Sequence, residues 1–353
     1  MAYSTIIKPQ DYFNTLLYSG NSTARSLTGV GFEPSFTWIK ERTSTSDHML
    51  FDQPRGVQKY ISSNLSNSES TSAGMLTAFG SDGFSLGSGN DVNDNGQTYA
   101  SWSWKANGQG SSNTDGTINT IYTSANTTSG FSISTYTGVG DVGSRTFGHG
   151  LTKAPEIVMI KNLTANENWV VGTNYTHPTL PWKYKLTLDN NSARTESGAY
   201  FADTAPTNSL VTIEGNAGVN GSGNTLVAYC FHSVSGFSKM GSYVGNGNAD
   251  GTFVYTGFKP AWILMKDIGR AESWYIYDGK ILGYNGQMGD FLANTSAAIG
   301  TNYSIQVDML SNGFKLNTTA SHLNGSGENF IYMAFAESPF VSNVGESLPT
   351  TAR

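Results

Sequence analysis

The sequence is poor in cysteine and in charged residues, and each shortage excludes a class of protein. Cys230 is the only cysteine, so the chain can form no internal disulfide and no cluster of thiolate ligands around a metal. Asp, Glu, Lys and Arg make up 13% of the residues, about half of what is usual in soluble domains. The net charge of −6 argues against a broad surface for binding nucleic acid.

Long apolar segments are also missing. The sequence has no uninterrupted apolar run of the length, about 18 residues, that a membrane-spanning helix needs, so we expect no membrane insertion. The first residues, MAYSTIIKPQDYF, contain no apolar core of a signal peptide, and we therefore expect no secretion.

Glycine, serine, threonine and asparagine take the place of the charged residues. The 41 glycines and the many hydroxyl and amide side chains are typical of short strands connected by tight turns. The same residue types lower helix propensity. The composition therefore predicts an all-β fold, in which the aromatic residues, 12% of the chain, supply large buried areas.

One sequence pattern occurs three times, in GFEPSFTWIK (31–40), LTKAPEIVMIK (151–161) and GFKPAWILMK (257–266). Each copy has a proline, an apolar β-rich stretch and a lysine six positions after the proline. The repeated residues are Pro34, Pro155 and Pro260, followed by Lys40, Lys161 and Lys266. Because proline has no N–H to donate, we expect a strand to begin just after each proline. The lysines are expected at solvated strand ends or in ion pairs within a unit or, alternatively, in contacts with a neighbouring subunit.

The shared register continues beyond the lysines. Fourteen positions after the prolines lie His48, Trp169 and Trp274, and eighteen positions after them lie Asp52, Thr173 and Asp278. A second shared segment is NDNGQTYASWSW (93–104), NGSGNTLVAYCF (220–231) and NGSGENFIYMAF (324–335). Its glycines, Gly96, Gly223 and Gly327, predict a turn that leads into a strand with alternating faces.

These repeats predict the domain organisation. We expect three tandem β-sandwich units of lectin-like or jelly-roll type, each of about 100 residues, produced by duplication. The predicted parts are an N-terminal arm (1–10), unit 1 (11–106), a linker (107–129), unit 2 (130–235), unit 3 (236–338) and a C-terminal arm (339–353).

The segment TGVGDVGS (137–144) matches the glycine spacing of a dinucleotide-binding loop. That loop needs a strand before the glycines and a helix after them. The residues that follow, SRTFGHGLTKAP, have no helical period and end at a proline. We therefore interpret this segment as a turn between strands and expect no cofactor.

Long stretches of the chain resemble a known protein family. The stretches are LYSGN, SLTGVGFEPSFTWIKERTSTSDHMLFDQPRGVQKYISSN, TAFGSDGFSLGSGNDVNDNGQTYASWSWKANG, TFVYTGFKPAWILMK and YMAFAESPF. They resemble structural proteins of tailed phages, abundant in phages of marine bacteria, that are described as tail-fibre or virion proteins with concanavalin-like sandwiches. The resemblance runs from Tyr12 to the terminal TTAR. It implies a place on the virion and assembly in the cytoplasm of a bacterial host, and it brings no catalytic residues.

The candidate sites are few. The recurring acids Asp52 and Asp278 are replaced by a threonine in the middle copy, which favours a turn cap over a catalytic pair. The loop GNDVNDNG (89–96) contains Asp91 and Asp94, a weak candidate for calcium, although turn chemistry alone explains its composition. The segment HPTLPWKYK (177–185) occurs only in the middle copy, so Trp182 and Tyr184 are the candidates for exposed ligand-binding residues.

The sequence therefore predicts a virion structural protein that is not an enzyme. The main hypothesis is a tail-fibre or appendage adhesin, a homotrimer with its units strung along a fibre, that contacts other virion proteins and a host surface glycan. The alternatives are a capsid-decoration or head-fibre protein that docks through extended terminal arms, and a carbohydrate-binding module without catalysis. A polysaccharide depolymerase is disfavoured because no pair of acids recurs in register.

Overall fold

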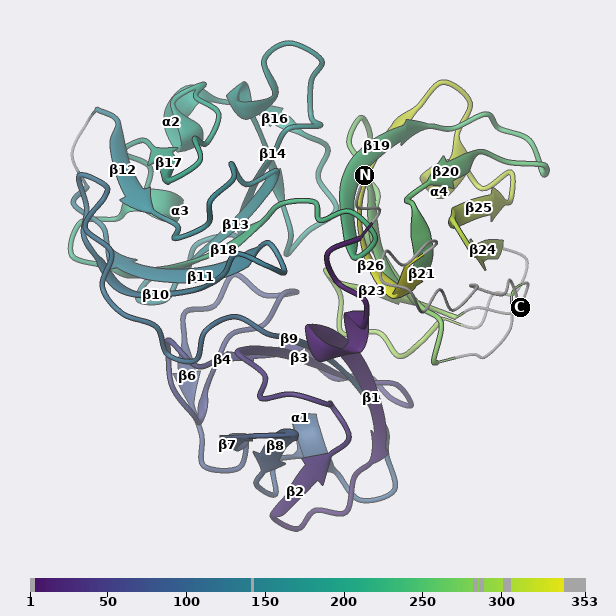
Figure 1. The fold of residues 1–353 in the computed structure, drawn as a ribbon, viewed down its shortest axis with the longest axis horizontal. Helices are drawn as coiled ribbons and strands as arrows, with labels where there is room; N and C mark the ends of the chain where they lie inside the picture. The colour runs from purple at the N-terminus through teal and green to yellow at the C-terminus, as the bar shows by residue number, and fades with distance from the viewer. Residues whose placement is uncertain (1–3, 141–142, 282–284, 286–288, 301–305, 340–353) are drawn as a thin grey trace.

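The structure is a computed structural model that describes residues 4–140, 143–281, 285, 289–300 and 306–339. Most of the regular structure in these residues is β-strand and every helix is short, which confirms the all-β prediction. Figure 1 shows three lobes around a common centre. We call them the first (13–104), second (120–231) and third (238–339) lobes. That they are three tandem domains with the boundaries given above stays a prediction.

Each lobe has a large antiparallel sheet. Four strands in each sheet are equivalent between the lobes, and they follow the same order. The opening strand pairs with the closing strand, which pairs with the strand that follows the repeated proline, which pairs with the next strand. In the first lobe these are β1 (Phe13–Ser19), β9 (Thr98–Trp104), β3 (Phe36–Glu41) and β4 (Met49–Asp52). In the second they are β11 (Phe131–Thr137), β18 (Thr225–Phe231), β13 (Ile157–Asn162) and β14 (Val170–Thr173). In the third they are β19 (Ser238–Val244), β26 (Asn329–Pro339), β21 (Phe258–Asp267) and β22 (Trp274–Asp278).

Further strands extend two of these sheets. The second lobe adds β10 (Thr120–Asn126), β15 (Tyr184–Thr187) and β16 (Thr195–Glu196), and the third adds β23 (Asp290–Leu292). A separate short hairpin in the first lobe pairs β5 (Lys59–Tyr60) with β6 (Ser70–Thr71). Because β10 lies inside 107–129, the segment expected to be a linker contains the edge strand of the second lobe.

A small sheet packs over the outer face of each large sheet. The small sheets are β2 (Arg25–Thr28), β8 (Gly83–Leu86) and β7 (Leu76–Gly80) in the first lobe, β12 (Arg145–Gly148) and β17 (Leu210–Ile213) in the second, and β20 (Phe253–Tyr255), β25 (Gly313–Asn317) and β24 (Gln306–Leu310) in the third. The helical turns are η1 (Pro9–Asp11), α1 (Asn90–Asn93), η2 (Pro181–Lys183), α2 (Gly198–Phe201), α3 (Ala217–Asn220) and α4 (Ser321–Asn324).

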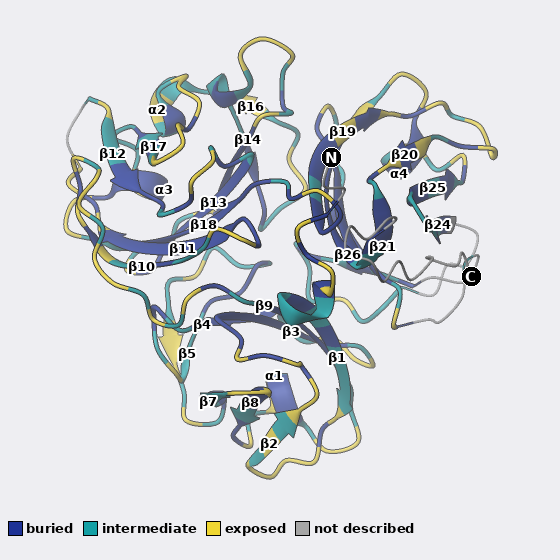
Figure 2. Ribbon diagram, in the orientation of Figure 1, coloured by how far each residue is buried: buried dark blue, intermediate teal, exposed yellow. Residues whose placement is uncertain are grey.

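The closing strands show why these sequences form sheets that are buried on both faces. In β9, Ala100, Trp102 and Trp104 alternate with Tyr99, as the sequence predicts. The first three join a core at the centre of the molecule, whereas Tyr99 joins the core between the two sheets of its own lobe. The strands β18 and β26 divide their side chains between two cores in the same way. Figure 2 shows the closing strands β9, β18 and β26 as buried over most of their length.

The central core is shared by all three lobes. Trp104 of the first lobe packs against Trp262 and Phe335 of the third, with ring centroids 5.5 Å and 5.6 Å away. Phe36 of the first lobe packs against Tyr229 of the second at 4.8 Å. The prediction of units strung along a fibre is therefore wrong, because the apolar inner faces of the large sheets bury one another.

The glycine-rich turn and the two terminal segments are described by the structure to different extents. The strands β11 and β12 flank the segment with the dinucleotide-like glycines, which agrees with a strand-to-strand turn. In the N-terminal arm, Ser4 and Ile6 are buried, and the amide of Gln10 donates to the Glu337 carbonyl at the end of the third lobe. Residues 340–353, nearly all of the predicted C-terminal arm, lie outside the described residues.

Candidate functional site

The three repeated lysines are buried and reach across the boundaries between lobes. Each ammonium donates a hydrogen bond to a backbone carbonyl of the neighbouring lobe. The contacts are Lys161 to Ser66 at 2.9 Å, Lys266 to Asn191 at 3.5 Å and Lys40 to Ser296 at 3.3 Å. The prediction of solvated strand ends is wrong, because the lysines are at most 1% exposed. The neighbour that each one contacts belongs to the same chain.

A ring nitrogen repeats the same cross-boundary contact. The residue fourteen positions after each proline bonds to the carbonyl four residues before the lysine's acceptor. The contacts are Trp169 Nε1 to Ser62 at 2.9 Å, Trp274 Nε1 to Thr187 at 2.8 Å and His48 Nε2 to Leu292 at 3.1 Å. His48 is the donor here, because its Nδ1 accepts from Trp38 Nε1 at 2.8 Å.

A backbone hydrogen bond runs in the opposite direction at each boundary. The N–H three residues after the lysine's acceptor donates to the carbonyl two residues after the lysine. These bonds join Glu69 N to Leu163 O, Arg194 N to Ile268 O and Ile299 N to Arg42 O, at 2.9, 2.9 and 3.1 Å. We call each set of three cross-boundary bonds a latch. Because the second lobe latches to the first, the third to the second and the first to the third, the latches close a ring.

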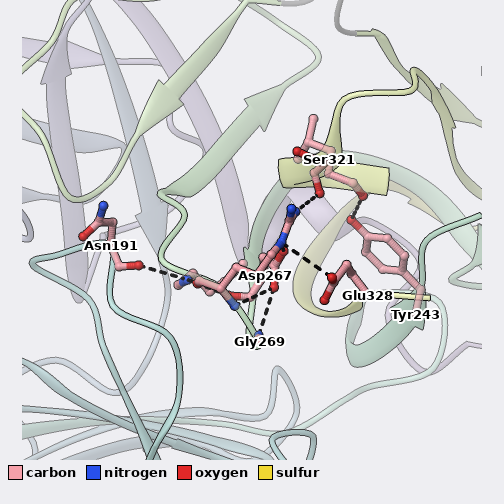
Figure 3. A network of polar contacts seen from close by, with 9 residues as sticks. Asn191, Tyr243, Asp267, Gly269, Ser321 and Glu328 are labelled. Carbon is pink, nitrogen blue, oxygen red and sulfur yellow. Dashed lines mark hydrogen bonds and ion pairs between the residues drawn. The ribbon is translucent and has the colours of Figure 1, made fainter. Parts of the chain in front are cut away.

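Figure 3 shows the surroundings of the third-lobe latch. Lys266 Nζ also donates to the carbonyls of Asp267 at 2.5 Å and Arg270 at 3.2 Å. The Asp267 carboxylate in turn accepts from the backbone N–H of Gly269 and pairs with the Arg270 guanidinium, whose Nε lies 2.8 Å away. The lysine is therefore held in a fixed turn, and its ammonium is surrounded by acceptors.

Burial changes the acid–base properties of the latch residues. Burial lowers the pKa of Lys40, Lys161 and Lys266 from 10.5 to about 8, and nearby carboxylates offset part of this effect. Burial and the neighbouring Lys40 ammonium hold the pKa of His48 well below its usual value, so the imidazole is neutral at pH 7.

The recurring acids also bond across the lobe boundaries. Asp52 Oδ2 accepts from the Tyr229 hydroxyl of the second lobe at 2.6 Å and pairs with Arg55 at 2.5 Å. Asp278 Oδ2 accepts from Thr15 at 2.6 Å and from the Trp102 indole at 2.8 Å, both in the first lobe. Burial raises the pKa of Asp278, and the hydrogen bond from Thr15 works against this rise. These acids are lobe-to-lobe contacts and not turn caps alone.

The second lobe has Thr173 where the other two lobes have an acid, and the residue at the matching position of the third lobe explains the difference. Trp102 and Tyr229 occupy the same position in their closing strands, and the matching residue of β26 is Met333. Methionine has no N–H or O–H to donate. A buried carboxylate at Thr173 would lack the donor that the other two copies supply, and burying it would be costly.

The repeated prolines and glycines have mostly their predicted roles. Strands β3 and β13 begin two residues after Pro34 and Pro155. Pro260 differs, since it lies inside β21 at a break in the pairing register, where its missing N–H disturbs no regular ladder. Gly96, Gly223 and Gly327 have φ of +80°, +71° and +77°, a backbone conformation that glycine adopts without strain.

Trp182 is buried, so the prediction that it is an exposed ligand contact is wrong. It is 1% exposed, packs edge-on against Phe201 at 5.1 Å, and donates to Asn174 at 2.7 Å. A Cβ on Gly172 of β14 would lie 2.4 Å from the Trp182 ring. The matching positions are Phe51 in β4 and Tyr277 in β22, which fill the cores of their lobes. Trp182 therefore supplies the aromatic ring that β14 lacks.

Tyr184 lies closer to the surface. Its ring stacks against His177 at 5.2 Å, the Arg194 guanidinium lies 5.2 Å from the ring centroid, and its hydroxyl donates to Glu196 at 3.2 Å. These neighbours occupy the ring and the hydroxyl, so Tyr184 belongs to a stabilising cluster beside the third-lobe latch, in which Arg194 takes part.

The calcium candidates do not come together into a metal site. Asp91 Oδ1 accepts from Ser46 at 3.1 Å, while Asp94 Oδ1 accepts from the backbone of Asn95 at 2.9 Å. Among the described residues, no group of three His, Cys, Asp or Glu side chains could hold a metal. In the same part of the chain, no helix has the length and apolar character needed to cross a bilayer.

Comparison with known proteins gives a family but no activity. Searches of curated proteins and of solved structures each returned no match. The family described as "Domain of unknown function (DUF7483)" matches residues 8–339, which include all three lobes. The chain therefore belongs to the DUF7483 family.

Proposed function

We propose that this protein is a non-enzymatic structural protein of a tailed-phage virion, and that it serves in a tail fibre or appendage as an adhesin for the host surface. The proposal starts from the sequence resemblance to phage structural proteins. The observation that carries it furthest is the ring of latches, in which the repeated lysines, tryptophans and acids hold lobe to lobe. The lysines and acids that could otherwise act as catalytic groups are occupied in contacts between the lobes.

The state of the recurring acids supports a function without catalysis. A glycosidase needs two carboxylates that a sugar can reach. Asp52 and Asp278 are at most 1% exposed and are already bonded to Tyr229, Arg55, Thr15 and Trp102. Buried acids that join the lobes suit a rigid body that presents its outer loops, as an adhesin does. They do not suit an enzyme, whose catalytic acids must reach the substrate.

The N-terminal arm favours the adhesin over a decoration protein that docks by strand exchange. Ser4 and Ile6 are buried, and Gln10 bonds to the end of the third lobe of the same chain. An arm folded onto its own chain is not free to add a strand to a neighbour. The three lobes of one chain already form a closed head-to-tail ring. A homotrimer is therefore not needed to bury the apolar inner faces of the lobes.

Localisation on the particle tests the proposal. A gold label on a C-terminal tag, imaged by electron microscopy on intact virions, is expected at the distal ends of tail appendages. Label over the head or at the root of the tail would contradict the adhesin role and favour a decoration role. Absence of label from purified particles that contain every other structural protein would contradict both.

A further inference from the structure

The small sheet of the third lobe presents two aromatic rings to solvent. Phe253 and Tyr255 lie two residues apart on β20 and are 44% and 58% exposed, whereas Val254 between them is buried at 6%. Alternation along the strand places both rings on the outer face of the sheet. Large exposed aromatic side chains on one face of a soluble protein often mark a binding surface.

The other two lobes show that the fold does not require these rings. The pairing of the strands aligns β20 with β2, because Tyr255 and Thr28 both lie opposite a glycine, Gly313 and Gly83. On this register Phe253 corresponds to Ser26 in the first lobe, and both Ser26 and Thr28 are exposed. In β12 of the second lobe the matching residues are Thr146 and Gly148. The same scaffold is stable with small residues at both positions.

The rest of the face is polar. Asp308, Lys315 and Phe253 lie side by side across β24, β25 and β20. Lys315 forms an ion pair with Asp250. Asp308 Oδ2 accepts from Asn317, but its Oδ1 is buried and has no hydrogen-bond partner among the described residues. In the first lobe the hydroxyls of the matching pair, Ser26 and Ser85, bond to each other at 2.8 Å.

The chemistry of this face matches a sugar chain. Two residues on one strand are separated by about 7 Å, so the two rings form an extended apolar platform. A pyranose can lay its C–H face on such a ring while its hydroxyls donate to an exposed carboxylate such as that of Asp250, which lies beside Lys315. Two carboxylates and one ammonium leave the face with a net negative charge, which disfavours a polyanion.

We propose that the outer face of the β20-β25-β24 sheet binds a neutral pyranose-containing glycan chain, with Phe253 and Tyr255 as stacking residues and the exposed Asp250 carboxylate as an acceptor. This proposal rests on the proposed role in host attachment and gives that role a site. It places the glycan contact in the third lobe and not at Trp182 and Tyr184 of the second.

The test uses the full-length protein and a swap of residues between lobes. The variant Phe253→Ser with Tyr255→Thr carries the first-lobe residues, and Ser26→Ala with Thr28→Ala is the matched control on the first lobe. Binding is measured on an array of neutral hexose oligosaccharides and uronate-containing anionic oligosaccharides, followed by affinity electrophoresis. Thermal unfolding verifies that the exposed substitutions leave the fold intact.

We expect the wild type and the control to bind neutral oligosaccharides, and the swap to bind them at least roughly tenfold more weakly, as loss of an aromatic hot spot does. Equal binding by the swap would overturn the site and leave the attachment role standing. Binding of anionic chains alone would overturn the ligand class. No binding by the wild type, together with self-association that the swap abolishes in sedimentation, would overturn the proposal in favour of a contact between copies.

Discussion

The indole Nε1 of Trp102 lies 2.8 Å from the Asp278 carboxylate, and the two residues come from the first and third lobes of the ring. Thr15, also in the first lobe, donates to the same oxygen at 2.6 Å. Asp278 is 1% exposed, so these donors are what make a buried acid tolerable at this boundary.

Removing the Trp102 indole should destabilise the fold, because the buried Asp278 carboxylate loses a hydrogen-bond donor. We expect Trp102→Phe to lower the free energy of unfolding by about 1–3 kcal/mol, the range for loss of a hydrogen bond to a charged group, because the carboxylate keeps the donor from Thr15 but loses the indole. Asp278→Asn combined with Trp102→Phe should lower it by less than the sum of the single effects. Urea unfolding of the two single variants and the double variant measures this, and strict additivity would show that the contact contributes nothing.

The latch lysines should contribute to stability through their hydrogen bonds. Lys161→Met leaves the carbonyl oxygens of Ser66 and Glu167 without their donor, so we expect a loss of roughly 1–3 kcal/mol. The exposed Lys153→Met is the matched control and should change the stability by less than about 0.5 kcal/mol. If the two variants unfold at the same urea concentration, the latch is not a stabilising contact.

The same lysines predict an increase of stability with pH. Their pKa is about 8 in the folded chain against 10.5 for a free lysine, so the unfolded chain binds more protons between these values. The free energy of unfolding should therefore rise between pH 8 and pH 9.5, and the rise should shrink when the three lysines are replaced by methionine. Urea midpoints at these pH values check this, and a fall in the wild type would contradict it.

Trp182 should behave as a core residue of the second lobe. We expect Trp182→Ala to cost about 3–5 kcal/mol, as large-to-small changes in cores do. Gly172→Phe alone should also destabilise, because its Cβ lies 2.4 Å from the Trp182 ring. Combined with Trp182→Gly, it should recover part of the loss, because it restores the ring position of Phe51 and Tyr277. If the double variant is no more thermally stable than Trp182→Ala, a ring at position 172 does not replace the ring of Trp182.

The sequence predicts the strands well, because its signal is local. The alternation in β9 and the glycines at 96, 223 and 327 each determine a conformation within a few residues. The positions of Lys40, Lys161 and Lys266 repeat as clearly, but their surroundings are set by carbonyls of another lobe, which no local pattern shows. The burial of Trp182 is hidden from the sequence for the same reason, since its ring fills the space above Gly172, a glycine that replaces an aromatic residue in β14.

The exposed aromatic face of β20 is only partly visible in the sequence. Aligning the copies on Pro34 and Pro260 sets Phe253 and Tyr255 against Leu27 and Gly29, whereas the strand pairing matches them to Ser26 and Thr28, one residue away. A pair of aromatic residues in one copy, opposite hydroxyls in another, points to a role outside the shared fold. Whether the rings are buried could be decided only from the packing.

Differential scanning calorimetry can show whether the three lobes form one closed body with a shared core. For a closed ring we expect a single transition in which the calorimetric and van't Hoff enthalpies agree, because no lobe can unfold without opening two latches and the central core. Two or three separable transitions, each with the enthalpy of about 100 residues, would show that the lobes are independent units and would contradict the closed ring.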